Sequence, residues 1–281
     1  MGLNKNKIMI FNCYPEQSRK NFDASNVGHP HDFFMDFLSR HTPDTDIDVC
    51  FIADLDQPIP TDNELVQYRG CIWTGSDLTI YQLEPRVERQ IALVKKLFNL
   101  GVNSYGSCWG IQIAAVAAGG RVAKSPKGRE WGIAKDITLT KAGEKSKLLK
   151  GKPKVFDGFI MHLDEVVKLP ENTQILAGNK HTKIQALEVN AGKASFFCTQ
   201  YHPEYNLFEM ARLIKARAQA LVTEGFFEKI DQALEYAKKL IQLHETPESV
   251  KLKTQLNIDE SVIDSGIKEQ ELRNWLNYLN I

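Results

Sequence analysis

The first two-thirds of the chain alternate short apolar runs with amphipathic helical segments, and this alternation restricts the possible fold most strongly. Residues 7–12 (KIMIFN), 46–52 and 71–74 (CIWT) are apolar runs of strand length. Residues 84–100 carry apolar side chains at helical spacing, and Gly101 then ends the segment. Strands that alternate with helices predict a mostly parallel sheet that helices cover on both faces.

The rest of the chain has two parts with different residue patterns. Residues 119–202 hold short β-rich runs separated by Gly, Pro, Asn and Lys, which predicts a smaller antiparallel set of strands. Residues 216–281 become helical, so we expect a main domain over 1–215 and a C-terminal helical extension over 216–281. Two apolar stripes are expected to face the protein, one of Phe227, Ile230, Leu234, Ala237 and Ile241, and one of Leu272, Trp275, Leu276 and Leu279.

Charge and cysteine content exclude several classes of function. Lys plus Arg and Asp plus Glu both total 35, so no basic excess exists to bind nucleic acid. No apolar run reaches the length that a membrane span needs. The five cysteines are scattered without a CxxC pair, which argues against a disulfide framework or a metal site and favours a reducing, cytoplasmic location.

One cysteine lies in a pattern that is typical of a nucleophile. Residues 105–110 (YGSCWG) place Cys108 between an expected strand at 103–106 and an expected helix at 111–118. Small neighbours allow the tight turn that exposes a nucleophile, and the helix N-terminus stabilises a thiolate. The alternative for a free cysteine is a small buried apolar side chain, and that reading suits Cys50, Cys71 and Cys198.

A histidine and a carboxylate follow a later apolar strand. Residues 200–204 (QYHPE) carry His202 and, two positions on, Glu204. In an extended segment these two side chains project to the same side, so Glu204 can orient the imidazole toward Cys108. A single histidine is more often structural, but here the three residue types together predict a Cys-His-Glu triad.

These motifs resemble the class I glutamine amidotransferases. The resemblance covers roughly residues 5–215 and includes GSCWGIQ at 106–112, QYHPE at 200–204 and GREWG at 128–132. The motif pattern is most similar to that of the glutaminase domain of GMP synthetase and of related free-standing proteins, among them the plant γ-glutamyl peptidases. The resemblance implies an α/β, flavodoxin-like fold for the main domain.

The resemblance also implies roles for single residues. Cys108 would form a γ-glutamyl thioester with the substrate, His202 would transfer the protons, and Glu204 would hold His202. The oxyanion would bind the backbone amides of Trp109 and of the loop at Gly75. In that loop Asp77 stands where many members have proline, which is a departure from the family pattern.

Further positions match family segments near the substrate. Gln112 corresponds to a substrate-binding glutamine, Trp131 and Gly132 to a stretch that holds the amino-acid end, and His162 and Asp164 to an H-x-D segment near the active site. The alternatives are an exposed helix glutamine, a core tryptophan and a solvated turn.

Three functions follow from the resemblance. The first is a glutaminase that releases ammonia for a partner synthetase chain, because the residues after 215 are too few for a synthetase domain. The second is a free-standing hydrolase or peptidase of γ-glutamyl amides, and the third is a non-catalytic interaction protein. For both enzymes we expect a small-molecule substrate and no cofactor.

Overall fold

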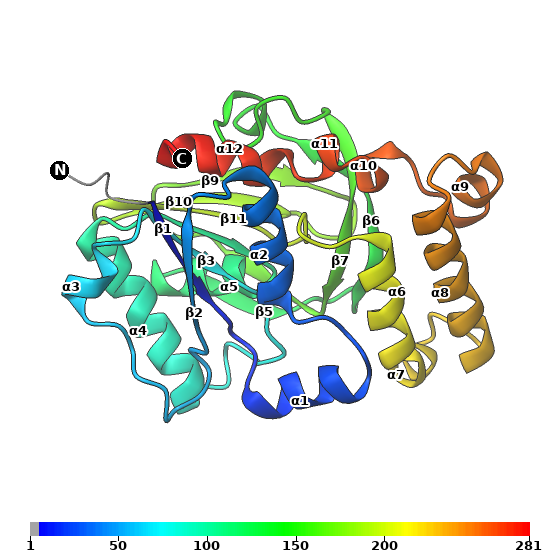
Figure 1. The fold of residues 1–281 in the computed structure, drawn as a ribbon, viewed down its shortest axis with the longest axis horizontal. Helices are drawn as coiled ribbons and strands as arrows, with labels where there is room; N and C mark the ends of the chain where they lie inside the picture. Colours follow the sequence, from blue (N-terminus) through cyan, green and yellow to red (C-terminus); the bar gives the residue numbers. More distant parts are fainter. Residues whose placement is uncertain (1–5) are drawn as a thin grey trace.

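A nine-stranded sheet forms the centre of the computed structural model, which describes residues 6–281 (Figure 1). Its first half is parallel and follows the order 2-1-3-4-5 of flavodoxin-like folds. In spatial order these strands are β2 (Asp46–Cys50), β1 (Lys7–Phe11), β3 (Gly70–Trp73), β4 (Ser104–Ser107) and β11 (Ala194–Thr199).

The second half of the sheet is antiparallel. It continues from β11 with β10 (Ala186–Ala191), β9 (Thr173–Gly178), β6 (Glu130–Leu139) and β7 (Val155–His162). A separate antiparallel pair joins β5 (Arg121–Lys124) to β8 (Asp164–Lys168). The predicted α/β fold, with parallel strands, a smaller antiparallel set and C-terminal helices, is confirmed.

Helices cover both faces of the parallel strands. Alternate residues of β1 point to opposite faces, so Met9 and Phe11 pack with α4 and α5, while Ile8 and Ile10 pack with α2 and α12. The helices up to the active-site segment are α1 (Glu16–Ala24), α2 (Pro30–His41), α3 (Asp62–Leu65), α4 (Pro85–Leu100) and α5 (Trp109–Ala117). A 3-10 turn, η1, spans Gly143–Lys145.

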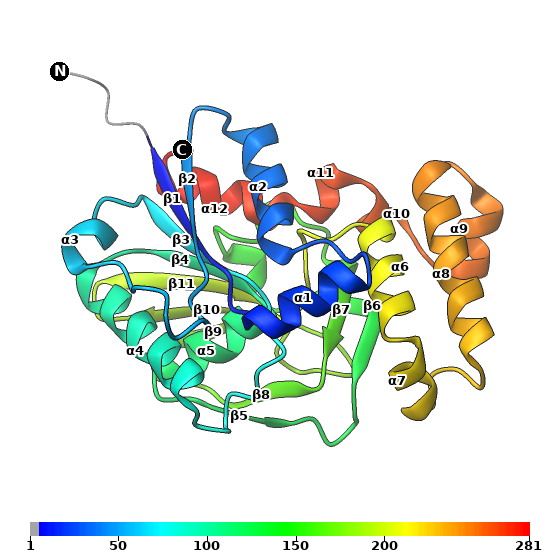
Figure 2. The same cartoon turned by 60° about the horizontal axis from the view of Figure 1, so that its bottom comes forward.

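The chain ends in a series of helices beside and beneath this sheet. They are α6 (Leu207–Ala216), α7 (Ala218–Thr223), α8 (Ile230–Glu245), α9 (Val250–Leu256), α10 (Glu260–Ile263), α11 (Ser265–Lys268) and α12 (Gln270–Leu279). Figures 1 and 2 show α8 and α9 beyond α6, outside the β6–β7 edge, and α12 returning to the sheet. The expected domain boundary after residue 215 stays a prediction.

One of the two expected C-terminal stripes is correct only in part. Ala237 is buried and Phe227 and Ile241 pack against the same cluster, whereas Ile230 and Leu234 are exposed. The buried face of α8 consists of Ala233, Ala237, Leu240 and Leu243, where the small alanine side chains let two helices approach closely. The stripe of α12 is confirmed, because its four expected residues are buried. No helix within residues 6–281 is both long and apolar enough to span a membrane.

Candidate active site

Cys108 lies at the turn between β4 and α5. Its backbone has φ +54° and ψ −91°, a conformation that non-glycine residues rarely adopt, and its N–H donates to the carbonyl oxygen of Thr199 (2.8 Å). A side chain at Gly106 would bring its Cβ to 2.8 Å from the Cα of Gly110, so the turn requires glycine there. The sequence thus builds the strained strand-to-helix turn that the motif predicted.

The parallel pairing of β4 with β11 brings His202 to the same edge of the sheet. Thr199, the last residue of β11, pairs with Ser107, the residue before Cys108. The N–H of His202 donates to the carbonyl oxygen of Phe159 (2.8 Å), which fixes the backbone next to β7. The carboxyl ends of parallel strands meet at one edge, and this is why two distant motifs become neighbours.

Glu204 holds the imidazole from behind. Its Oε1 lies 2.7 Å from Nδ1 of His202 and also accepts a hydrogen bond from the hydroxyl of Ser107 (2.7 Å). Both His202 and Glu204 are buried. The role of Ser107 was missed from the sequence, although the residue lies within the cysteine motif.

The surroundings of His202 favour a charged ring. Burial disfavours the imidazolium, but the charge of Glu204 and the hydrogen bonds to Cys108 and Glu204 outweigh it and raise the pKa of His202 to about 10. The ring is therefore positively charged at neutral pH, next to the sulfur of Cys108.

The two expected oxyanion positions both adjoin this pair. Trp109 begins α5 directly after Cys108, so its N–H belongs to the unsatisfied first turn of the helix. Gly75 follows β3, and a Cβ there would lie 3.3 Å from Cε1 of His202 and 3.8 Å from Cβ of Cys108. The absence of a side chain lets the loop backbone approach Cys108 and His202.

A cavity of about 210 Å³ opens in front of Cys108 and His202. Of the expected substrate residues, Gln112, His162 and Asp164 line it, and Nε2 of Gln112 donates to the backbone carbonyl of Asp164 (3.2 Å). These residues come from α5, β7 and β8. The structure thus brings together three of the five positions that the family segments suggested.

Trp131 and Gly132 do not line this cavity. The ring of Trp131 packs at 5.0–5.9 Å, centroid to centroid, against three aromatic rings of the C-terminal part: Phe226, Phe227 and Tyr236. Gly132 has φ +73° and open space around its Cα. The alternative of a packing tryptophan therefore describes Trp131.

Sequence reasoning missed other residues that line the cavity, among them Tyr14, Arg129, Tyr205 and Arg217. Tyr205 directly follows Glu204, and its ring centroid lies 4.7 Å from that of His202. Tyr205 could have been found from its place beside the histidine motif. Arg129 lies within the GREWG segment, although no role was assigned to it, whereas Tyr14 and Arg217 lie far apart in the sequence and belong to no recognised motif.

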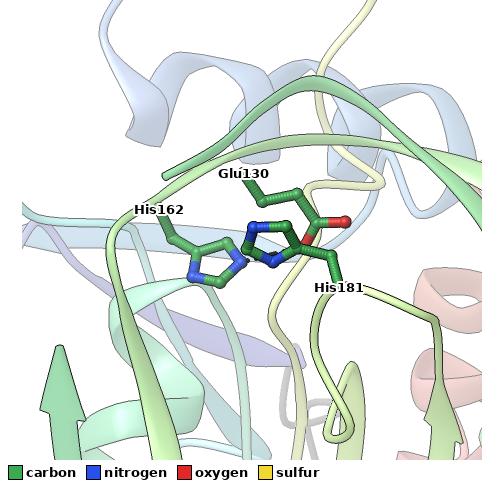
Figure 3. Close-up of side chains that lie close together, drawn as sticks. All are labelled: Glu130, His162 and His181. Atoms are coloured by element: carbon green, nitrogen blue, oxygen red, sulfur yellow. Dashed lines mark hydrogen bonds and ion pairs between the residues drawn. The ribbon is translucent and has the colours of Figure 1, made fainter. Parts of the chain in front are cut away.

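His162 also belongs to a buried polar cluster (Figure 3), whose donor atoms on Glu130, His162 and His181 lie within 4.8 Å of one another. Such side chains can ligate zinc. Nε2 of His162 lies 3.1 Å from Oε2 of Glu130, which also accepts from Gln185 (2.9 Å), and Nδ1 of His181 lies 3.6 Å from the same oxygen. Since Nδ1 of His162 lies 2.9 Å from the carbonyl oxygen of Asp164, the network holds this ring at the cavity wall.

Comparison with known proteins identifies the family of the chain. The glutamine amidotransferase class-I family pattern matches residues 57–218. A γ-glutamyl-L-1-hydroxyisopropylamide hydrolase from Pseudomonas sp. is 30% identical, over 99% of this chain and 95% of its own. A glutamine-hydrolysing GMP synthase from Leifsonia xyli subsp. xyli is 36% identical over 48% of this chain but only 25% of its own.

The fold is shared with a solved structure. A glutamine amidotransferase from Thermotoga maritima superposes with a TM-score of 0.67 at 16% identity, covering 98% of each chain. The order of the motifs, the family match and the full-length similarity to the Pseudomonas hydrolase all point the same way. The chain belongs to the class-I glutamine amidotransferase family, and thereby to a class of amidohydrolases.

Proposed function

We propose that this protein hydrolyses γ-glutamyl amides, with Cys108 as the nucleophile and His202 as the group that transfers protons. Glu204 orients His202. The observation that carries the proposal is the alignment of these groups. A cysteine in a strained turn at a helix N-terminus adjoins a buried imidazole, and a carboxylate lies 2.7 Å from the opposite side of that imidazole.

The reaction proceeds in two halves. The thiolate of Cys108 attacks the γ-carbonyl carbon, and the oxyanion accepts hydrogen bonds from the backbone N–H groups of Gly75 and Trp109. The C–N bond breaks as His202 donates its proton to the departing nitrogen. A water molecule then gives a proton to His202 and attacks the thioester, which releases glutamate and restores the thiolate.

Glu204 and Ser107 support this cycle without contacting the substrate. Glu204 keeps Nδ1 of His202 protonated, so that Nε2 is the atom that exchanges the proton. Ser107 donates to the same carboxylate oxygen and fixes its position. The preformed arrangement removes much of the entropic cost of bringing these groups together.

Similarity favours the free-standing hydrolase over the glutaminase that serves a synthetase. The relative named for hydrolysis of a γ-glutamyl amide matches this chain nearly from end to end, including the C-terminal helices. The GMP synthase match supports ammonia release for a partner chain as a second candidate, but covers only a quarter of that protein. A non-catalytic role is the least supported, because all three triad side chains are present and adjacent.

Release of glutamate from glutamine and from γ-glutamyl amides tests the proposal. Replacement of Cys108 by Ala should lower kcat/KM by at least about 10³-fold, since the covalent route is lost. Cys50→Ser is a matched control, because Cys50 is half-buried and lies outside the cavity. A Cys108→Ala protein that keeps its activity would refute the assignment.

A further inference from the structure

Two chemically different groups of side chains line the cavity in front of Cys108. In the first, Gln112 is hydrogen-bonded to the backbone of Asp164. In the second, the ring of Tyr205 packs against His202 at a tilt of 60°, and the hydroxyl of Tyr14 adjoins Gly75 together with the His202 ring. Because His202 protonates the departing nitrogen in the proposed reaction, the amine half of the substrate lies beside the second group, which we call the amine end, and the glutamyl half lies beside the first.

Arg217 lies at the amine end without a bound carboxylate. It lines the cavity from the junction of α6 and α7, and within residues 6–281 its side chain makes no hydrogen bond or ion pair. Arg217 lines the same cavity as Tyr14 and Tyr205; burial raises the pKa of both hydroxyls, and the charge of Arg217 acts against that rise. It also acts on Glu224, but both oxygens of that carboxylate are bound by Arg129 (2.6 and 2.9 Å).

The two tyrosines are also without partners. Both are more than nine-tenths buried and line the cavity, and neither hydroxyl has a hydrogen-bond partner in the part of the chain that the structure describes. Two free phenol donors next to a guanidinium form a site suited to an anion with two oxygen atoms. A carboxylate binds guanidinium through two parallel charge-assisted hydrogen bonds.

The other charged groups of the cavity do not take this role. Arg129 is occupied by Glu224, and Oδ1 of Asp164 accepts from the hydroxyl of Tyr81 (3.0 Å). The exposed Asp77, on the loop after Gly75, also lines the cavity and raises the pKa of Tyr14, so its negative charge opposes that of Arg217 and cannot bind an anion. Arg217 is thus the cation available to a negatively charged leaving group.

We propose that Arg217, with the hydroxyls of Tyr14 and Tyr205, binds a carboxylate on the departing amine, so that γ-glutamyl amides of amino acids or peptides are the preferred substrates. This inference rests on the hydrolysis proposed above and adds the class of leaving group. Arg217 determines specificity and takes no part in bond making or breaking.

Two substrates that differ only in charge test this assignment. γ-Glutamylglycine carries a carboxylate on its leaving amine, and γ-glutamylglycinamide replaces it with a neutral amide of almost the same size. The wild-type protein should prefer the first by about 10- to 100-fold in kcat/KM. In Arg217→Gln this ratio should fall to near 1, and Arg217→Lys should restore part of it.

Two further variants separate binding from structural effects. Lys215→Gln removes an exposed positive charge from the last turn of α6, outside the cavity, and should leave the ratio unchanged. Tyr14→Phe keeps the buried ring, and should lower the ratio about 3- to 10-fold by removing one donor. Calorimetry should show that the Cys108→Ala protein, which does not turn the compounds over, binds them with the same preference.

The outcomes distinguish failure of this inference from failure of the proposed function. Equal rates for the two substrates in the wild type, or equal loss of both in Arg217→Gln, would overturn the role of Arg217 while hydrolysis stands. Equal loss would place the guanidinium on the α-carboxylate of the glutamyl half. Absence of Cys108-dependent hydrolysis of either compound and of glutamine would overturn the proposed function, and this inference with it.

Discussion

Replacement of Glu204 by Gln should remove the negative charge beside His202 while keeping the shape of the side chain, so that the effect of the charge can be measured separately. The side chain keeps its size, and one amide oxygen can still accept from Nδ1 of His202 and from Ser107, as Oε1 of the carboxylate does. The new NH₂ group would occupy the position of Oε2, which is buried without a hydrogen-bond partner in residues 6–281. That unpaired donor costs about 1–3 kcal/mol of folding free energy.

The electrostatic effect is larger. The pKa of His202 is raised from 6.5 to about 10, which corresponds to about 5 kcal/mol in favour of the charged ring. Burial opposes that charge, and Glu204 contributes the largest of the effects that raise the pKa. Without the carboxylate, the pKa of His202 should fall by several pH units, and kcat/KM should drop by about 10²- to 10⁴-fold.

The pH dependence of folding gives an independent measure. A folded-state pKa above the unfolded value stabilises the protein fully below pH 6.5, and this contribution is lost as the pH rises through 10. The difference in unfolding free energy between the wild type and Glu204→Gln should therefore be largest near pH 6.5 and shrink toward pH 10.

Histidine NMR titration, kcat/KM and urea unfolding from pH 6.5 to 10 measure these effects. Glu235→Gln, an exposed change on α8, is the control and should match the wild type. A Glu204→Gln protein with an unchanged His202 pKa and full activity would refute the reasoning.

Three other substitutions test separate parts of the structure. Gly75→Ala puts a Cβ 3.3 Å from Cε1 of His202, so kcat/KM should fall at least about 10-fold with little loss of stability; full activity would mean that the loop does not approach the reacting groups. Trp131→Ala removes the ring that packs against the C-terminal aromatic residues. The free energy of unfolding in urea should fall by about 2 kcal/mol, and proteolysis after residue 224 should become faster. Unchanged unfolding and proteolysis would contradict the packing role. Lys152→Met leaves Glu271 buried without its partner at 2.7 Å, which should cost about 3–5 kcal/mol at pH 7, and a neutral effect on thermal unfolding would disprove that estimate.

The triad positions could be predicted because each motif carries its own geometry. Cys108 lies in a turn that glycine neighbours permit, and His202 and Glu204 are two positions apart after a strand. The predicted alternation of strands and helices then places both motifs at one sheet edge. Local chemistry and topology thus pointed to the same place.

Other features depend on packing that no local pattern reveals. Trp131 matched a family segment, but a match in sequence does not tell whether a side chain faces the cavity or the C-terminal helices. In α8, Ala233 and Ala237 face α6 because small side chains allow close approach, while Leu234 stays exposed. The predicted stripe was therefore correct at Phe227, Ala237 and Ile241 and wrong at Ile230 and Leu234.

Apart from Tyr205, which follows the histidine motif, the amine end of the cavity could not be found from the sequence. Tyr14, Tyr205 and Arg217 come from the loop after β1, the segment after β11 and the α6–α7 junction. They become neighbours only because the sheet places the ends of β1 and β11 on the same side. A cation without a partner is visible only once its surroundings are known.

The covalent step can be observed directly. Protein that is acid-quenched during turnover of γ-glutamylglycine, then digested and mapped by mass spectrometry, should carry one γ-glutamyl unit on Cys108 and none on Cys13, Cys50, Cys71 or Cys198. An acyl group on another residue, or turnover that continues in Cys108→Ala without any acylated cysteine, would contradict Cys108 as the nucleophile.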